Sequence, residues 1–144
     1  MKIDIEWNSE SEADMVTRLR AAGLRPTRQR VELGNLLFAR GNRHLTAETL
    51  HEEAEKANVR VSLATVYNTL HQFTEAGLLR EVSVDAARTY FDTNISDHHH
   101  FFVEDENRLI DVKGDIQVGA IPPPPEGMEV TSVDIVVKVR RTAD

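Results

Sequence analysis

The stretch that decides the fold is SLATVYNTLHQFTEAG, residues 62–77. Ser62 can cap a helix N-terminus with its hydroxyl group, and Gly77 can end the helix. Between them, Val66, Leu70 and Phe73 follow at spacings of four and three, the pattern of a helix with one apolar face. The opposite face is expected to carry side chains that can contact DNA without a large charge, namely Thr65, Tyr67, Asn68, Thr69 and Gln72.

Three further helices are expected before this one, each begun by a side chain that can cap a helix. The caps are Ser9 (in a capping box with Glu12), Thr27 and Thr46, and the helices are expected to end at Gly23, about Ala39 and about Ala57. Residues 42–45 are expected to form a loop.

Segments 78–84 and 88–91 alternate polar and apolar residues around Asp85-Ala86-Ala87, which predicts a β-hairpin. Helices followed by a hairpin predict a winged helix-turn-helix domain over residues 1–93, with the helix at 62–77 as the reader of the DNA major groove. The chain is therefore expected to be an α+β protein.

Composition excludes several classes of protein. The 144 residues suit one domain or two small ones, and no apolar run approaches the ~18 residues of a membrane span. The first ten residues are acidic and lack the apolar region of a secretory signal, so we expect a cytoplasmic protein without a membrane partner. The absence of cysteine excludes disulfides, a cysteine nucleophile and a CxxC zinc clamp.

The net charge of −7 is unevenly distributed. Residues 1–94 carry 12 Lys and Arg against 14 Asp and Glu, a net of −2, whereas residues 95–144 carry 5 against 10, a net of −5. Between Met15 and Val31 there are five arginines and no acid. Such a basic strip suits phosphate contact, and the three arginines nearest the second helix are expected at the DNA backbone, namely Arg25, Arg28 and Arg30.

Three consecutive histidines, His98, His99 and His100, lie between Asp92 and Asp111. If this segment is extended, His98 and His100 share one face and His99 points the other way. Imidazole and carboxylate donors suit zinc, manganese or ferrous iron. The alternatives are a solvated polar loop or a patch of packed histidine rings.

Several separated motifs resemble the ferric uptake regulator (Fur) family. They lie within residues 19–112 and comprise Gly23-Leu24-Arg25-x-Thr27-x-x-Arg30, His44-x-Thr46-Ala47-Glu48, Ala64-Thr65-Val66-Tyr67-Asn68-Thr69-Leu70, Glu75-Ala76-Gly77-Leu78 and His98-x-His100. The resemblance implies a homodimeric, metal-responsive transcription factor that binds a double-stranded operator. Its small α/β dimerisation domain would then occupy residues 94–144. Family members commonly have Arg at the position of Asn68, so the operator sequence cannot be carried over.

The resemblance also implies a regulatory site for a divalent metal (Fe, Mn or Zn) formed by His44, Asp92, His98, His100 and Asp111. A cation held by both halves would fix their relative angle and so couple metal binding to DNA affinity. The family's structural zinc is expected to be absent, because Val103 and Glu106 stand at the first CxxC pair. Packing of residues 101–103 would have to stabilise that region. A further His/acid site of the family retains at most Asp97 and His99.

The cysteine-free chain with its histidine triplet is most similar to the iron response regulator (Irr) branch of the family. That similarity implies a regulator of iron and haem genes, with haem bound near His98, His99 and His100. Two alternatives are a metal- or peroxide-responsive repressor without haem sensing and a metal or haem carrier without DNA coupling. A metal-dependent hydrolase is disfavoured because the sequence lacks its motifs.

The C-terminal part is expected to contain two strands, residues 108–112 and 129–140, with a short helix at 115–120 and a stiff connector at 122–125. In the second strand one alternating set is almost wholly apolar and is expected to be a buried sheet face: Thr131, Val133, Ile135, Val137 and Val139. One small sheet buries little by itself, so pairing with a second copy is expected.

Overall fold

The computed structural model describes residues 9–96 and 98–143, with the backbone alone for residues 9–12. The chain divides into two compact units, Met1–Ile95 and Ser96–Asp144, which we call the N-terminal and C-terminal units. The capping box predicted at Ser9 and Glu12, and the side chain of Asp97, lie outside the described residues.

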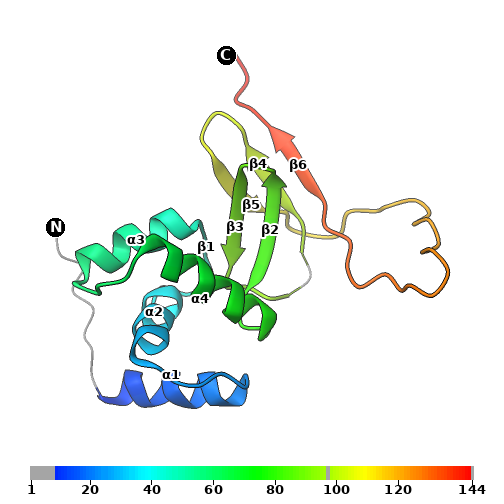
Figure 1. The fold of residues 1–144 in the computed structure, drawn as a ribbon. Coiled ribbons are helices and arrows are strands. Elements are labelled where there is room, and N and C mark those ends of the chain that lie inside the picture. The colour runs from blue at the N-terminus through cyan, green and yellow to red at the C-terminus, as the bar shows by residue number, and fades with distance from the viewer. Residues whose placement is uncertain (1–8, 97, 144) are drawn as a thin grey trace. The chain divides into compact units, whose positions relative to one another are not determined.

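Four helices make up most of the N-terminal unit (Figure 1). They are α1 (Ser9–Ala21), α2 (Arg28–Phe38), α3 (Ala47–Lys56) and α4 (Leu63–Glu75). The three described caps are confirmed: the side chains of Thr27, Thr46 and Ser62 accept hydrogen bonds from backbone N–H groups of the first helical turn at 3.3, 3.2 and 3.1 Å. Gly23 and Gly77 end their helices at φ +80° and +82°, a conformation that costs glycine little.

The core of the N-terminal unit forms around the apolar face of α4. Val66, Leu70 and Phe73 are fully buried, as their spacing predicted. Leu50 and Ala54 of α3 are buried in the same cluster, together with the leucines of α2. Because these side chains are buried, the opposite face of α4 is the one exposed to solvent, and we call it the open face.

A three-stranded sheet completes the N-terminal unit in the order β1-β3-β2. The expected hairpin is formed by β2 (Arg80–Asp85) and β3 (Arg88–Asp92). The expectation of a loop at 42–45 is wrong in its second half, because His44–Leu45 form β1, which pairs antiparallel with β3. Leu45 is buried and lies opposite the buried Phe91, so a shared apolar core holds this short strand against β3.

The C-terminal unit contains a second three-stranded sheet, in the order β5-β4-β6. Strand β4 (His100–Val103) pairs antiparallel with β5 (Arg108–Asp111) and parallel with β6 (Val136–Val139). Phe102, Val103 and Leu109 are buried. The strand expected at 108–112 is therefore present.

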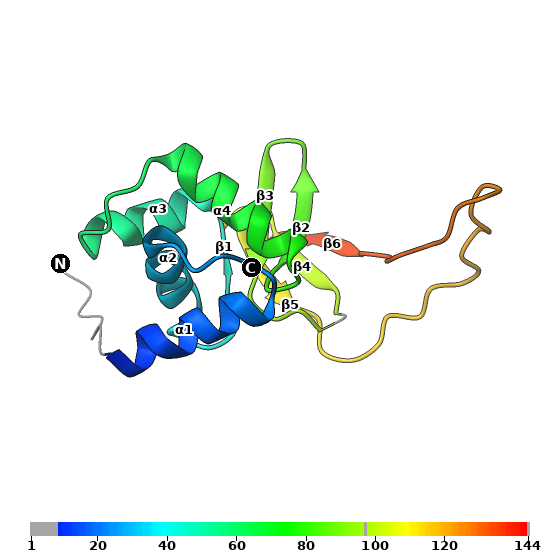
Figure 2. The same ribbon diagram turned by 60° about the horizontal axis from the view of Figure 1, so that its bottom comes forward.

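The C-terminal part differs from the expectations in three respects. Residues 115–120 form no helix, and the strand expected at 129–140 is reduced to β6; the chain from β5 to β6 runs as a long loop (Figure 2). A short segment that contains Gly119 and precedes Pro122 is a poor helix former, and most of its residues are exposed. Of the apolar set expected to be buried, Val133 and Val137 are 39% and 37% exposed in the single chain, whereas Ile135 and Val139 are half-buried.

Within the described residues, every helix is too short or too polar to cross a lipid bilayer.

Candidate metal centre and nucleic-acid interface

A His–Asp pair forms in the N-terminal unit because β1 aligns with β3. His44 lies directly opposite Asp92, and residues opposed in this way project on the same side of the sheet. The His44 Nε2 atom is 3.2 Å from Oδ2 of Asp92. Asp92 is 1% exposed, and its Oδ1 accepts a hydrogen bond of 2.9 Å from the backbone N–H of Asn94. Both oxygens of this buried carboxylate therefore have a partner: Oδ1 has the backbone N–H of Asn94, and Oδ2 has the imidazole of His44.

A cluster of two histidines and one aspartate forms in the C-terminal unit, and we call it the triad. The antiparallel pairing of β4 with β5 places His100 opposite Asp111, with Nε2 3.3 Å from Oδ1. The Nε2 atom of His98 is 3.2 Å from the same oxygen, and the two imidazole centroids are 4.5 Å apart. The prediction that these two histidines share one face is therefore confirmed.

The other nitrogen of His98 faces a backbone carbonyl. Its Nδ1 atom is 2.6 Å from the carbonyl oxygen of Ser96, which can only accept, so Nδ1 carries the proton. In the neutral ring, Nε2 then has the lone pair that a metal needs. Metal-ligating histidines usually donate their second N–H group in this way, so the triad fits a metal site.

His99 points away from the triad, as alternation along an extended chain predicted. Its Nδ1 atom accepts a hydrogen bond of 3.1 Å from the backbone N–H of Ile135, and its carbonyl oxygen accepts one from Val112. A cavity of about 500 Å³ lies here, lined by His98, His99 and residues of the long loop, including Ile116 and Val133.

The donor set in each unit determines which cations it can hold. Two imidazoles and one carboxylate suit ferrous iron, manganese or zinc and leave coordination positions open. The His44–Asp92 pair offers the same kinds of donor, but two side chains are fewer than a tightly bound transition metal needs.

At Glu106, where the family resemblance placed a cysteine, an ion pair is present that the sequence did not reveal. Arg141 donates from Nε and Nη2 to Oε1 of Glu106 at 2.9 and 2.7 Å, and its backbone N–H donates to Asp105. The guanidinium group holds the pKa of the Glu106 carboxyl below its ordinary value. The Glu106–Arg141 ion pair therefore connects the segment after β6 with the turn between β4 and β5.

The open face of α4 carries most of the residues predicted to contact DNA. Tyr67, Asn68 and Gln72 are exposed, and Thr65 is half-buried. The expectation that Thr69 lies on the open face is wrong. Thr69 is 5% exposed and donates its hydroxyl hydrogen to the carbonyl of Thr65 at 2.8 Å. It follows Val66 by three residues and precedes Phe73 by four, so it shares their buried face.

Tyr67 is held by a residue of the preceding helix. Its hydroxyl group donates a hydrogen bond of 2.7 Å to Oε1 of Glu48 on α3. This bond lowers the pKa of Glu48 and raises the pKa of Tyr67. Glu48 was absent from the predicted DNA-binding residues, because this contact joins residues 19 positions apart.

The three predicted arginines have different surroundings. Arg25 is exposed, and Arg28 is exposed with its Nε atom donating to Glu32 at 2.8 Å. Arg30 is half-buried, and its guanidinium group donates to the carbonyl of Arg25 at 2.9 Å and to Oε1 of Gln72 at 3.0 Å. Arg30 therefore links α2 with α4.

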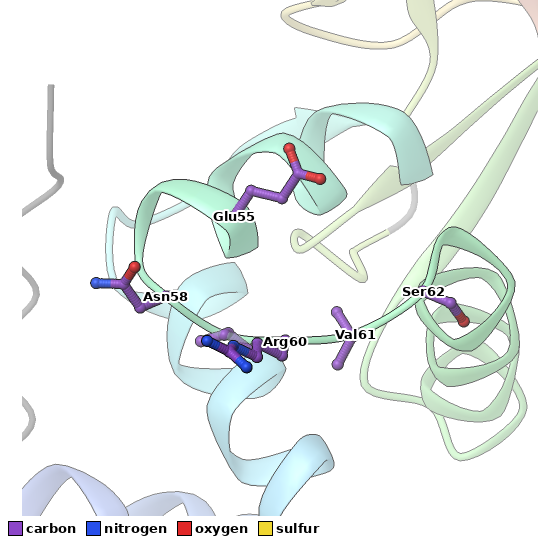
Figure 3. A pocket seen from close by; sticks show the side chains of 6 residues that line it. Glu55, Asn58, Arg60, Val61 and Ser62 are labelled. Carbon is purple, nitrogen blue, oxygen red and sulfur yellow. The ribbon is translucent and has the colours of Figure 1, made fainter.

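One more arginine, Arg60, lies close to the start of α4 and is absent from the residues predicted to contact DNA. A shallow pocket of about 490 Å³ lies where α3 is joined to α4, and Figure 3 shows Arg60 on this connection, two residues before the cap Ser62. Arg60 is exposed. Helix N-termini and nearby arginines are common contacts to DNA phosphates.

Comparisons with known proteins agree with this architecture. The model of the ferric uptake regulator family matches residues 21–137. A peroxide-responsive repressor (PerR) from Staphylococcus aureus is 28% identical over 111 residues, which cover 77% of this chain and 74% of that protein.

Two solved structures have the same fold. The ferric uptake regulator from Pseudomonas aeruginosa with manganese is 27% identical, with a TM-score of 0.66 over 88% of this chain and 97% of that chain. The ferric uptake regulator from Vibrio cholerae is 21% identical, with a TM-score of 0.69 over 88% of this chain and 98% of that chain. The predicted fold class is confirmed.

Proposed function

This chain belongs to the ferric uptake regulator family, and we propose that it is a homodimeric, DNA-binding transcriptional regulator whose operator affinity depends on a bound divalent cation. Members of this family are transcriptional regulators and not enzymes. The observation that carries the proposal is the triad, in which imidazole nitrogens of His98 and His100 lie 3.2 and 3.3 Å from the same oxygen of Asp111.

DNA binding is assigned to the open face of α4. Tyr67, Asn68 and Gln72 lie on this face, and a helix of this kind enters the major groove in winged-helix proteins. Arg25, Arg28 and Arg60 are exposed and would contact phosphates.

The cation is assigned to donors from both units. The triad supplies three donors and the His44–Asp92 pair supplies two, so together they would complete the coordination of manganese, iron or zinc. The manganese bound to the Pseudomonas aeruginosa relative supports a cation of this class. Because the donors belong to two units, the ion would restrict the angle between them.

Dimerisation is assigned to the C-terminal unit. Val133 and Val137 are exposed in the single chain, and so are Val118, Ile121, Met128 and Val130 of the loop before β6. So large an apolar surface on a small unit favours cover by a second copy. In a dimer, the ion in each chain would set the spacing between two α4 helices and hence their match to two half-sites.

A DNA-binding titration with metal control tests the function. The metal-loaded protein would be used to select duplexes from a randomised pool, and affinity for the selected duplex would be measured with Mn²⁺ and after chelation. We expect tight binding only with the metal, and a reduced effect of the metal after the combined change His98→Ala and His100→Ala. Equal affinity for the selected duplex with and without Mn²⁺ would contradict metal control, although DNA binding itself would stand.

Haem sensing of the iron response regulator type is a second proposal. The cavity beside His98 and His99 supports it, because its lining offers two imidazoles together with the aliphatic side chains of Val112, Ile116 and Val133, among polar residues. The test is haem absorption spectroscopy of the wild type and of His99→Ala, followed by operator binding with haem present. Spectra that are identical for the two proteins would remove His99 from the proposal.

The same titrations separate the alternatives. Release of DNA by hydrogen peroxide from the iron-loaded protein, without any effect of haem, would favour the peroxide-responsive type of the Staphylococcus aureus relative. Metal or haem binding by a protein that selects no duplex would favour a carrier.

A further inference from the structure

We propose that Arg30 is a positioning residue that fixes the orientation of the Gln72 carboxamide, and so determines which hydrogen-bonding group Gln72 presents to DNA. The inference rests on the proposed DNA-binding function, and it differs from the expectation that Arg30 simply contacts a phosphate.

Two hydrogen bonds hold the Arg30 guanidinium group. One nitrogen donates to the carbonyl of Arg25 at 2.9 Å, and the other donates to Oε1 of Gln72 at 3.0 Å. The backbone N–H of Arg30 is bound to the cap residue Thr27. Arg30 is half-buried, in contrast to the exposed Arg28 two residues earlier. The Arg30 side chain is therefore held at its backbone end by Thr27 and at its guanidinium end by Arg25 and Gln72.

The chemistry of the two groups fixes the Gln72 amide. A guanidinium group has only donors, so it must face the carboxamide oxygen and not the NH₂ group. With the oxygen directed at Arg30, the NH₂ group projects from the other side of the amide. Gln72 is exposed and lies one helical turn after Asn68, on the open face of α4.

This orientation restricts what Gln72 can recognise. A freely rotating glutamine reads adenine with both groups at once, accepting from N6 and donating to N7. An amide whose oxygen is held by Arg30 offers two donors instead. Its natural partners are acceptors, such as O6 and N7 of guanine, O4 of thymine or a phosphate oxygen.

Two substitutions separate the positioning role from other roles. Gln72→Glu keeps an oxygen for Arg30, and it strengthens the link between α2 and α4 because the new pair is charged. It removes both NH₂ donors, however. Arg30→Met keeps an unbranched side chain but releases the amide. Arg28→Met is the matched control because it removes the same charge from the same helix turn, where Arg28 is bound to Glu32.

The test uses the full-length, Mn²⁺-loaded protein and duplexes selected from a randomised pool. We expect Gln72→Glu to unfold at the same temperature as the wild type or higher, yet to bind the selected duplex roughly five- to 150-fold more weakly. We expect Arg28→Met to select the wild-type sequence with uniformly lower affinity. Arg30→Met should select a sequence that differs at one position in each half-site, where adenine becomes acceptable.

Unchanged duplex affinity in Gln72→Glu would overturn the inference, and so would an identical selected sequence for Arg30→Met and Arg28→Met. If Arg30→Met does not fold, Gln72→Glu can still overturn the inference, because that variant retains the link between the helices and unchanged affinity would show that the NH₂ donors of Gln72 make no contact with DNA. A wild-type protein that selects no sequence would instead overturn the proposed function and this inference together.

Discussion

His100 and Asp111 are direct partners across the β4–β5 pair, with the imidazole Nε2 atom 3.3 Å from the carboxylate Oδ1 atom. The N-terminal unit repeats the arrangement, since His44 lies opposite Asp92 across the β1–β3 pair at 3.2 Å. In both sheets, strand register alone brings an imidazole to a carboxylate. The chain therefore carries a His–Asp arrangement in each of its two compact units.

Removal of a triad imidazole is expected to weaken metal binding. In His100→Ala the affinity for Mn²⁺ should fall at least ~10- to 100-fold, because loss of even an indirect supporting group at a metal site has an effect of that size. His99→Ala is the control, since its Nδ1 atom is bound to Ile135 and points away from the triad. Calorimetric titration measures both, and equal losses in the two variants would contradict the assignment.

The Tyr67–Glu48 hydrogen bond predicts a pH dependence. The pKa of Glu48 is lowered chiefly by this bond, so the bond stabilises the protein above the ordinary pKa of a glutamate and is lost as the pH falls through the lowered value. In Tyr67→Phe the pKa of Glu48 should rise towards its ordinary value, as followed by NMR of the side-chain carboxyl carbon. Glu106 is an internal control, because Arg141 lowers its pKa independently. A Glu48 titration that does not move would exclude the bond in solution.

Arg60 is expected to contact a DNA phosphate. Arg60→Ala should weaken binding to all duplexes alike and reduce the slope of log affinity against log salt by about 1. Arg141→Ala removes the same charge from an arginine paired with Glu106 and should leave the slope unchanged. Affinities measured at several salt concentrations test this, and a sequence-dependent loss in Arg60→Ala would point to a base contact instead.

Val137 is expected to lie in the dimer interface. Val137→Asp would place a charge in a desolvated contact and should shift the protein towards the monomer. Lys138→Ala, on the opposite face of β6, is the control. Sedimentation measures the mass of each protein, with circular dichroism to verify folding. A Val137→Asp protein that remains dimeric at low concentration would place the interface elsewhere.

The parts of the fold that depend on neighbours in sequence could be predicted. Thr27, Thr46 and Ser62 cap the helices that their positions indicated, because a cap and its N–H partner are only three residues apart. The stripe of Val66, Leu70 and Phe73 likewise predicted the buried face of α4. Thr69 was misplaced because its polarity was given more weight than its position beside that stripe.

Contacts between distant residues could not be predicted. Strand β1 depends on pairing with residues 91 and 92. The links Glu48–Tyr67, Arg30–Gln72 and Glu106–Arg141 join residues that are 19, 42 and 35 positions apart. The apolar alternation at 129–139 predicted a long buried strand, yet a single chain has too few neighbours to cover it. The alternation at residues 98–100 was a local signal and correctly separated His99 from His98 and His100.

The most direct test of the central claim is a calorimetric titration of Mn²⁺ into the wild type and into His44→Ala. If one ion is held by both units, the wild type should bind a single ion per chain tightly, and His44→Ala should bind it at least ~10-fold more weakly although the triad is intact. Binding by His44→Ala with the wild-type affinity would show that the C-terminal unit holds the ion alone, and the proposed coupling between metal and DNA through a shared ion would be wrong.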